Sequence, residues 1–412
     1  MSTYECIDRL GGWKGYRVSA VERFAPSGPD TRARVWIALE PLPGRRLRCG
    51  VCGHAGDTVH DAVERWVREL PMFDADTWLK VRRCRVWCPR CGGPKLEALE
   101  WLSPYARVTR RFAESVGRLC QVLPVKHVAA YYGLGWDQVK ALDQAFLART
   151  VGPVDLTGVE AIAMDEFAIQ KGHRYATVVV EPHSHRVLWV GRGRGRQEVR
   201  PFFQLLGRVG CARLRAVAMD MNASYELEVQ HHCPQAEIVY DLFHVVAKYG
   251  REVIDRVRVD EANQWRHHRS ARKVIKGARW LLLRNRENLV GPDDRVKLRE
   301  LLKVNRRLFT VYVMKDDLKH LWSYRYPGAA RRFWNAWYTR AVRSRIMPLV
   351  AFAKRLKRYL PGILAHCRWP LHTSVIEGIN NKIKVIKRMA YGFRDDTYFF
   401  LKIRAAFPGN AG

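Results

Sequence analysis

Two short apolar runs near the middle of the chain each end at an aspartate, and this repeated pattern limits the possible folds more than any other feature. Asp165 ends the run in AIAMDEF, and Asp220 ends the run in AVAMDMN. Short apolar runs bounded by polar residues are typical of buried strands. A single aspartate after a strand is often only a turn former or a helix N-cap. Two aspartates in the same AxAMD context favour a shared site, in which a divalent cation offsets the repulsion between them.

Five strands and two helices are predicted around these aspartates, in the order β-β-β-α-β-α-β. The strands are expected at 159–167, 174–182, 186–193, 215–220 and 237–241. This order is that of the ribonuclease-H-like fold, an α/β fold with a mixed sheet whose first and fourth strands are neighbours. Asp165 and Asp220 would then meet. Side chains alternate along a strand, so Glu166 is expected to point away, and Asp165 is selected as the ligand.

The charge of the chain indicates a polyanionic partner. The 412 residues carry a formal net charge of +32, and 48% of them are hydrophobic, enough for a sizeable core. Nucleic acid is the first candidate for such a partner. A membrane is disfavoured, because the chain contains no run of about 18 apolar residues. No secretory signal is visible at MSTYECIDRL, so a cytoplasmic protein is expected.

Two CxxC pairs predict a zinc site in the N-terminal third. The pairs are separated by 35 residues, and each places two thiolates on a tight turn. Two such turns supply the tetrahedral sulfur set that Zn²⁺ prefers, although four buried free thiols are the alternative. The predicted ligands are Cys49, Cys52, Cys88 and Cys91, with Cys84, His54 and His60 as weaker substitutes. Three arginines next to the second pair suggest a phosphate-contacting surface: Arg82, Arg83 and Arg85.

Residues from about Ser103 to Thr150 are predicted to be helical, with a start at Ser103–Pro104. The segment VKHVAAYYGLGWDQVKALDQAF has a short helix, a glycine-containing turn and a second helix. This layout is typical of a helix-turn-helix, although an ordinary helical hairpin is common. The expected DNA contacts are Arg110 and Arg111 on the first helix and Gln138 and Lys140 on the last; Trp136, Val139 and Leu142 are expected to pack inside.

A long basic helical region is predicted between Tyr240 and Pro370, where no strand period is found. Residues 251–360 contain 29 Lys and Arg but only 10 Asp and Glu, a net charge of +19. A solvated helical face could equally be built from mixed charges. The imbalance therefore favours a surface that meets the DNA backbone.

A third carboxylate, Glu377, lies on a predicted helix after Pro370. Ser374 and Glu377 have the spacing of a helix capping box, which is a purely structural explanation for the glutamate. Asn381, Lys384 and Arg388 are expected to continue the same helical face, and the two cations are expected to contact DNA. A carboxylate followed by cations on one face suits a metal ion and a phosphate, and both explanations can hold together.

The chain resembles bacterial insertion-sequence DDE transposases, in the family with an N-terminal zinc finger, a helix-turn-helix and a ribonuclease-H-like core split by a helical insertion. The resemblance rests on AIAMDEFAIQKGHRYATVVVE, AVAMDMNASY, EIVYDLFHVV and VIEGINNKIKVIKRMAYGFRD. It implies that Asp165, Asp220 and Glu377 are the catalytic triad and hold two Mg²⁺ or Mn²⁺ ions. Asp241 and His244 match a D-x-x-H signature of related transposases, whereas Leu242 stands where the family often has arginine.

The resulting prediction is a DNA transposase that cuts and joins strands at the ends of an insertion sequence, with one structural Zn²⁺. A homodimer or larger assembly on double-stranded DNA, both transposon ends and target, is expected. The alternatives are a transposase-derived repressor without catalysis and a metal-dependent nuclease. The expected domains are a zinc module (1–100), a helix-turn-helix (101–152), a first core part (153–244), a helical insertion (245–370) and a second core part (371–412).

Overall fold

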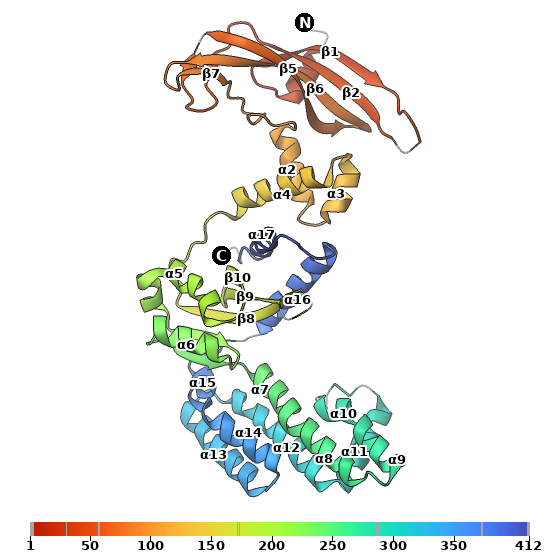
Figure 1. Ribbon diagram of the computed structural model, residues 1–412, viewed down its shortest axis with the longest axis vertical. Coiled ribbons are helices and arrows are strands. Elements are labelled where there is room, and N and C mark those ends of the chain that lie inside the picture. The colour runs from red at the N-terminus through yellow and green to blue at the C-terminus, as the bar shows by residue number, and fades with distance from the viewer. Residues whose placement is uncertain are drawn as a thin grey trace. The chain divides into compact units, whose positions relative to one another are not determined.

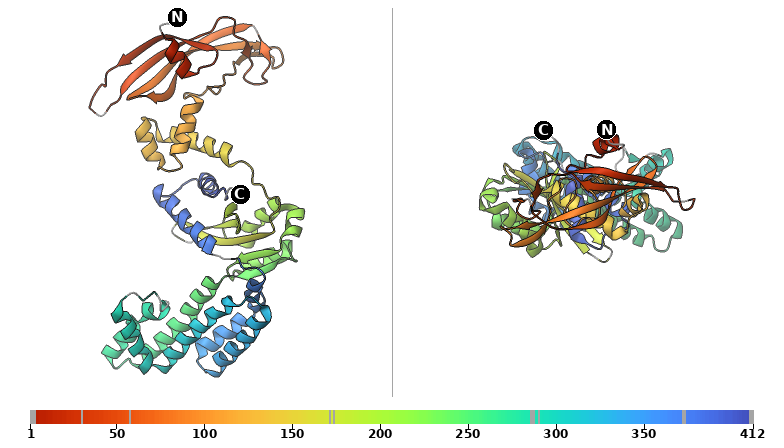
Figure 2. Two further views of the ribbon diagram at one scale, coloured as in Figure 1. Left: turned by 180° about the vertical axis from the view of Figure 1, so that it is seen from behind. Right: turned by 90° about the horizontal axis from the view of Figure 1, so that it is seen from above.

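The computed structural model shows two compact units, Met1–Gly152 and Pro153–Gly412. Their elements can be followed in Figures 1 and 2. The structure describes residues 4–29, 31–56, 58–170, 172, 174–284, 288–289, 291–371 and 374–409, without the side chains at 292 and 374. Each unit is described by itself below.

The N-terminal unit begins with a five-stranded sheet. After helix α1 (Glu5–Gly11), strands β1 (Tyr16–Phe24), β2 (Ala33–Pro41), β6 (Ala75–Cys88) and β5 (Val59–Met72) follow one another across it, and β7 (Gly93–Leu96) pairs with β6. Strands β3 (Leu47–Arg48) and β4 (Ala55–Gly56) form a separate small hairpin. Alternating residues of β2 and β6, such as Ile37 and Leu79, are fully buried in the core of this sheet.

Three helices complete the N-terminal unit: α2 (Arg110–Leu119), α3 (Val125–Tyr132) and α4 (Trp136–Val151). The expected helix start at Ser103–Pro104 is wrong. Helix α2 begins instead at Arg110, where the Thr109 side chain accepts a hydrogen bond from the Phe112 N–H and caps the helix. The predicted turn between α3 and α4 is confirmed, since Gly133 ends α3 in the left-handed region with φ 64°.

The second unit is built on a sheet with the strand order β10-β9-β8-β11-β12. Its strands are β8 (Ala161–Gln170), β9 (Arg174–Glu181), β10 (Arg186–Arg192), β11 (Ala216–Met219) and β12 (Glu237–Tyr240). The first three strands pair antiparallel, while β8, β11 and β12 run parallel. The sequence prediction of a mixed sheet in which the first and fourth strands are neighbours is therefore confirmed.

Helices cover both faces of this sheet (Figure 1). Helices α5 (Arg196–Arg213) and α6 (Ala223–His232) bury apolar side chains such as Phe202 and Val229 against one face. Helices α16 (Ser374–Met389) and α17 (Asp396–Ala406) bury Ile379, Ile383 and Phe399 against the other. Residues from the far end of the chain are thus part of the same core as β8.

Between β12 and α16 the described residues form helices and no strand, as the sequence predicts. These elements are α7 (Leu242–Tyr249), the π-helix η1 (Gly250–Ile254), α8 (Asp255–Gln264), α9 (Arg269–Gly277), α10 (Arg279–Leu283), α11 (Pro292–Val304), α12 (Arg306–Lys319), the 3₁₀ turns η3 (His320–Ser323) and η4 (Ala365–Cys367), α13 (Pro327–Arg343), α14 (Met347–Lys357) and α15 (Leu360–Leu364). Helix α15 approaches β12 closely at Gly362, where an added Cβ would lie 2.5 Å from the Tyr240 ring. Among the described residues, no helix is long and apolar enough to cross a membrane.

Candidate active site and metal centres

A cleft of about 600 Å³ opens at the edge of the sheet where the parallel strands end. Strands β8 and β11, the residues after β12 and helix α16 all contribute to its walls. Both predicted aspartates line it, together with Glu377, although these three residues lie far apart in sequence. The cleft is lined by Met164, Asp165, Glu166, Phe167, Ala168, Met219, Asp220, Asp241, Phe243, His244, Arg251, Ile376, Glu377, Asn380, Ile383, Lys384 and Lys387.

Strand register places Asp165 and Asp220 at the same level of the sheet. Ala163 of β8 pairs with Ala218 of β11, and each aspartate follows two residues later. Asp165 does not end its strand as expected, because β8 continues to Gln170 through its antiparallel pairing with β9. Asp220, in contrast, directly follows the last residue of β11.

Burial raises the pKa of both carboxyl groups. The pKa of Asp165 rises to about 6, because removal from water and the nearby Asp220 charge outweigh the Glu166 N–H and His244. The pKa of Asp220 is raised by burial and by Glu166, although His244 acts in the opposite direction. Asp220 Oδ1 is buried and has no hydrogen-bond partner among the described residues. Buried, mutually repelling carboxylates with an unused oxygen fit a divalent cation.

Asp241 lies at the same level on the next strand, since Met219 pairs with Tyr240. Its Oδ1 accepts a hydrogen bond from the Phe243 N–H at 2.9 Å and so caps α7. Its Oδ2 lies 3.7 Å from His244 Nε2. The D-x-x-H pair therefore fixes the start of α7 beside the cleft and turns an imidazole toward it.

Glu377 projects from the first turn of α16 into the cleft and is exposed to solvent. A carboxylate in the first turn of a helix also interacts favourably with the helix dipole. The other half of the predicted capping box, the Ser374 side chain, lies outside the described residues.

The face of α16 that lines the cleft differs from the expected one. Lys384 lines the cleft, but Asn381 and Arg388 are exposed and are not among the lining residues. With 3.6 residues per turn, the lining positions are centred on Asn380, and Arg388 falls outside that stripe. Sequence reasoning missed Asn380 and Lys387, and also Arg251 of the π-helix. The spacing of Ile376, Ile379 and Ile383 marks the buried side of α16 and could have indicated Asn380.

Strand alternation places the side chains of Asp165 and Glu166 on opposite faces of β8, as predicted, because Asp165 is hydrogen-bonded to Asn380 of α16, whereas Glu166 pairs with Arg194. Glu166 lines the cleft, and its Oε1 accepts an ion-paired hydrogen bond from Arg194 at 2.7 Å. Arg194 also lies over the Tyr175 ring at 4.2 Å. Glu166 therefore already has a cationic partner, whereas Asp220 Oδ1 does not.

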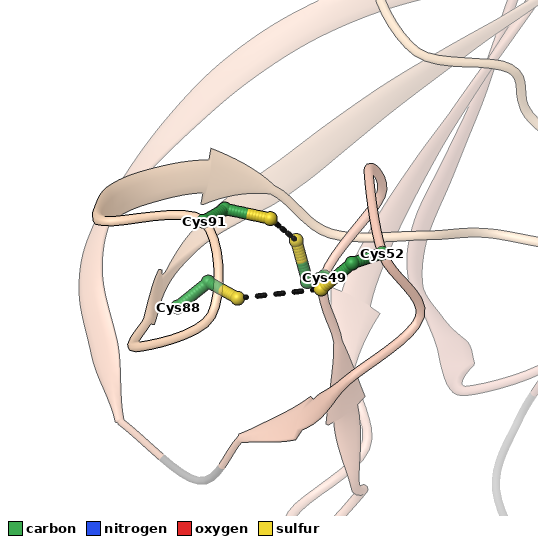
Figure 3. A group of neighbouring side chains, drawn as sticks. All are labelled: Cys49, Cys52, Cys88 and Cys91. Atoms are coloured by element: carbon green, nitrogen blue, oxygen red, sulfur yellow. Dashed lines mark hydrogen bonds between the residues drawn. The ribbon is translucent and has the colours of Figure 1, made fainter.

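The four predicted cysteine ligands form one cluster, shown in Figure 3. Their sulfur atoms all lie within 4.8 Å of one another, with Cys49–Cys91 at 3.9 Å and Cys52–Cys88 at 3.5 Å. Zn–S bonds of about 2.3 Å in a tetrahedron place sulfurs about 3.8 Å apart, so the cluster is compatible with structural zinc. Burial raises the pKa of the Cys49 thiol, but the Cys52 and Val51 N–H groups outweigh it and lower the pKa to about 7.

The substitute zinc ligands are placed differently. Cys84 is buried outside the cluster, where its sulfur lies 3.6 Å from Arg45. His60 lies 3.3 Å from Asp61 through Nδ1 and stacks near Trp87. Neither His54 nor His60 belongs to the four-residue cluster among the described residues.

Of the three arginines beside the zinc module, Arg82 is exposed, whereas Arg83 is buried. Arg83 donates hydrogen bonds to the Glu97 and Ser103 carbonyl groups, which removes it from the candidate phosphate contacts. Arg85 is half-buried and paired with Asp61. Burial on the strand's inner face explains the correction, since alternate residues of β6 point into the core.

Part of α4 in the helix-turn-helix is exposed to solvent. Gln138 is exposed as predicted, but Lys140 is half-buried with its ammonium 5.8 Å from the Trp136 ring. Trp136 itself is exposed, contrary to the packing expected of it. On α2, Arg110 is exposed, while Arg111 donates two hydrogen bonds to Glu69. An aromatic ring at the N-terminus of α4 is thus an additional surface feature.

Comparisons with known proteins agree with this arrangement. The transposase family model of the ISL3 group matches residues 162–403, and the helix-turn-helix domain of transposase family ISL3 matches residues 97–146. The transposase for insertion sequence element IS1001 of Bordetella parapertussis is 55% identical over 405 residues, covering 98% of each chain. The transposase for IS1557 of Mycobacterium tuberculosis is 28% identical, over 88% of this chain and 86% of that relative. The chain therefore belongs to the ISL3 family of insertion-sequence transposases, DNA-cutting enzymes with a helix-turn-helix DNA-binding domain and a DDE transposase domain.

Proposed function

We propose that Asp165, Asp220 and Glu377 are the triad with which this transposase cuts and joins DNA in the presence of Mg²⁺ or Mn²⁺. The observation that carries the proposal is the shared cleft, to which β8, β11 and α16 each bring one carboxylate. Oxygen ligands of this kind suit either ion. When bound, two such ions supply charge stabilisation at the attacking and leaving oxygens of an in-line phosphoryl transfer.

The remaining cleft residues position the DNA. The ammonium groups of Lys384 and Lys387 and the guanidinium of Arg251 line the cleft beside the carboxylates and suit backbone phosphates. His244 lies at the start of α7 beside Asp241, the residue that caps this helix, and is assigned to a phosphate contact. In cleavage, a water oxygen loses a proton and bonds to phosphorus, while the bond from phosphorus to the 3′ oxygen breaks and that oxygen leaves as a 3′-OH. In joining, this DNA 3′-OH loses its proton and bonds to a phosphorus of the target strand, whose own 3′ oxygen leaves and is protonated.

DNA binding is assigned to the helix-turn-helix, with Gln138 reading base edges and Arg110 contacting phosphate. Supporting contacts to the DNA backbone are assigned to further basic residues. These are the exposed Arg82, the partly paired Arg85 and Arg111, the half-buried Lys140, and Arg388 beyond the cleft. One Zn²⁺ held by the four-cysteine cluster stabilises the N-terminal sheet. A homodimer or larger assembly follows from the need to handle two DNA ends. It would act in the bacterial cytoplasm on transposon ends and target DNA.

The test is cleavage of duplex DNA that carries the element's own ends, with and without Mg²⁺. Wild-type protein should cut at the ends only with metal, and Asp165→Asn should bind the same DNA without cutting it. Equal cutting by both proteins would overturn the proposal, and binding without metal-dependent cutting by wild type would favour a repressor.

A strand-transfer assay with a pre-cut 3′-OH end separates a transposase from a nuclease. Joined product should form with wild type and Mg²⁺. Cutting without any joined product, under the same conditions, would instead indicate a nuclease.

A further inference from the structure

Asn380 links the two halves of the candidate active site through a single hydrogen bond. Its Nδ2 donates to Oδ2 of Asp165 at 2.6 Å, across 215 residues of sequence. Asn380 is only 8% exposed and lies three residues after Glu377 on α16. An ionised carboxylate only accepts hydrogen bonds, so the amide nitrogen, and not its oxygen, has to face Asp165.

This hydrogen bond completes the support of the Asp165 side chain. Its other oxygen, Oδ1, accepts the Glu166 N–H at 2.8 Å. Each carboxylate oxygen therefore has one protein donor and keeps another lone-pair direction for a cation. A carboxylate held at both oxygens loses little rotational freedom on binding a metal ion, which favours a fixed ligand geometry.

The other end of the Asn380 amide is unused. Its Oδ1 is buried and has no hydrogen-bond partner among the described residues. Neighbouring Ile379 and Ile383 are buried against the sheet and hold this part of the helix in place. A buried carbonyl oxygen without a partner is destabilising, and a cation or a cation's water ligand would supply the missing partner.

We propose that Asn380 is a positioning residue that orients Asp165 for metal binding and fixes the helix of Glu377 against β8. The inference rests on the proposed metal-dependent function of the cleft. It assigns the amide a role that packing alone does not require, because an apolar side chain of the same volume would also fill the space.

The test measures Mn²⁺ affinity of the full-length protein by electron paramagnetic resonance, independently of DNA cutting. Asn380→Leu keeps the number and branching of the side-chain heavy atoms and removes the donor; Asn380→Ala removes both the donor and most of the side chain. Both variants should bind Mn²⁺ about tenfold or more weakly than wild type, the size of effect seen when a ligand's supporting hydrogen bond is lost. Asn381→Leu, on the exposed side of the same helix, should leave the affinity unchanged.

The possible outcomes separate the two proposals. Mn²⁺ affinity of a folded Asn380→Leu or Asn380→Ala protein within twofold of wild type would overturn the role of Asn380 and leave the proposed function intact. Circular dichroism identifies which variants are folded, and an affinity lost equally in Asn381→Leu would show a general effect of disturbing α16. A wild-type protein that binds no Mn²⁺ and cuts no DNA would overturn the proposed function itself.

Discussion

Arg194 forms an ion pair with Glu166, the residue that follows Asp165 in the sequence. The distance between Arg194 Nη1 and Glu166 Oε1 is 2.7 Å. The pair distinguishes two adjacent carboxylates. Glu166 has a positively charged partner, whereas the hydrogen bonds that Asp165 accepts from the Glu166 N–H and from Asn380 come from neutral donors. The finding supports Asp165 as the ligand by a route different from strand alternation.

Exchange of Glu166 for glutamine should therefore lower the rate of DNA cutting only slightly. The ion pair is partly exposed, with side-chain exposures of 48% for Arg194 and 25% for Glu166. Such pairs contribute about 0–1 kcal/mol, so the rate of end cleavage should fall by roughly fivefold or less. Single-turnover cleavage in Mg²⁺ measures this, with Asp165→Asn as the inactive comparison. A loss for Glu166→Gln as large as that for Asp165→Asn would show that Glu166 is itself a metal ligand.

Asp220→Asn should stabilise the metal-free protein while it abolishes cutting. Ionised Asp220 is buried with an unused oxygen, and a neutral amide avoids the cost of the charge. The expected gain at pH 7.5 is about 1–2 kcal/mol in the free energy of unfolding. Thermal unfolding in EDTA measures it, and Mg²⁺ should raise the melting temperature of wild type only. A lower melting temperature for Asp220→Asn in EDTA would contradict the explanation.

The contribution of Asp165 to the stability of the metal-free protein should fall as the pH rises from about 4 to about 6. The pKa of Asp165 is about 6 in the folded protein and about 3.9 in an unfolded chain, so the folded state binds the proton more tightly. Its contribution is present below pH 4 and is lost as the carboxyl ionises between pH 4 and pH 6. Comparing unfolding of wild type and Asp165→Asn across this range isolates the effect. A stability difference that does not change between pH 4.5 and pH 7 would contradict it.

Substitution of the cysteine ligands should remove the bound zinc. Cys49→Ser with Cys52→Ser should lower the zinc content by about one ion per chain and destabilise the N-terminal sheet, because structural zinc contributes directly to folding. Metal analysis and limited proteolysis measure the two effects. Cys84→Ser is the matched control, since Cys84 is buried nearby but outside the cluster. Zinc loss in the control alone would show that the ligands are assigned wrongly.

Much of this fold could be predicted from the sequence because the pattern is local. The runs AIAMDEF and AVAMDMN contain enough apolar residues to define strands, and their order limits the sheet to one arrangement. The CxxC pairs were equally clear, because two thiolates on one turn have few other uses. Glu377 was ambiguous, since its spacing from Ser374 suits a helix cap as well as a metal site.

The parts that were predicted wrongly depend on tertiary contacts. Whether Arg83 is buried depends on the Glu97 and Ser103 carbonyl groups, which lie on other segments. The position of Arg388 depends on how α16 is rotated against the sheet, which is set by the buried isoleucines and not by the position of Glu377.

The most direct test of the triad is the rate at which Glu377→Gln cuts end-containing DNA in Mg²⁺, relative to wild type. Glutamine is similar in size to glutamate and can occupy the same position in the first turn of α16, but it removes the charge. If Glu377 completes the metal site, the rate should fall on the order of 1000-fold or more while DNA affinity and thermal stability stay unchanged. A rate within about tenfold of wild type would show that Glu377 is a structural residue at the start of α16 and that the triad is assigned wrongly.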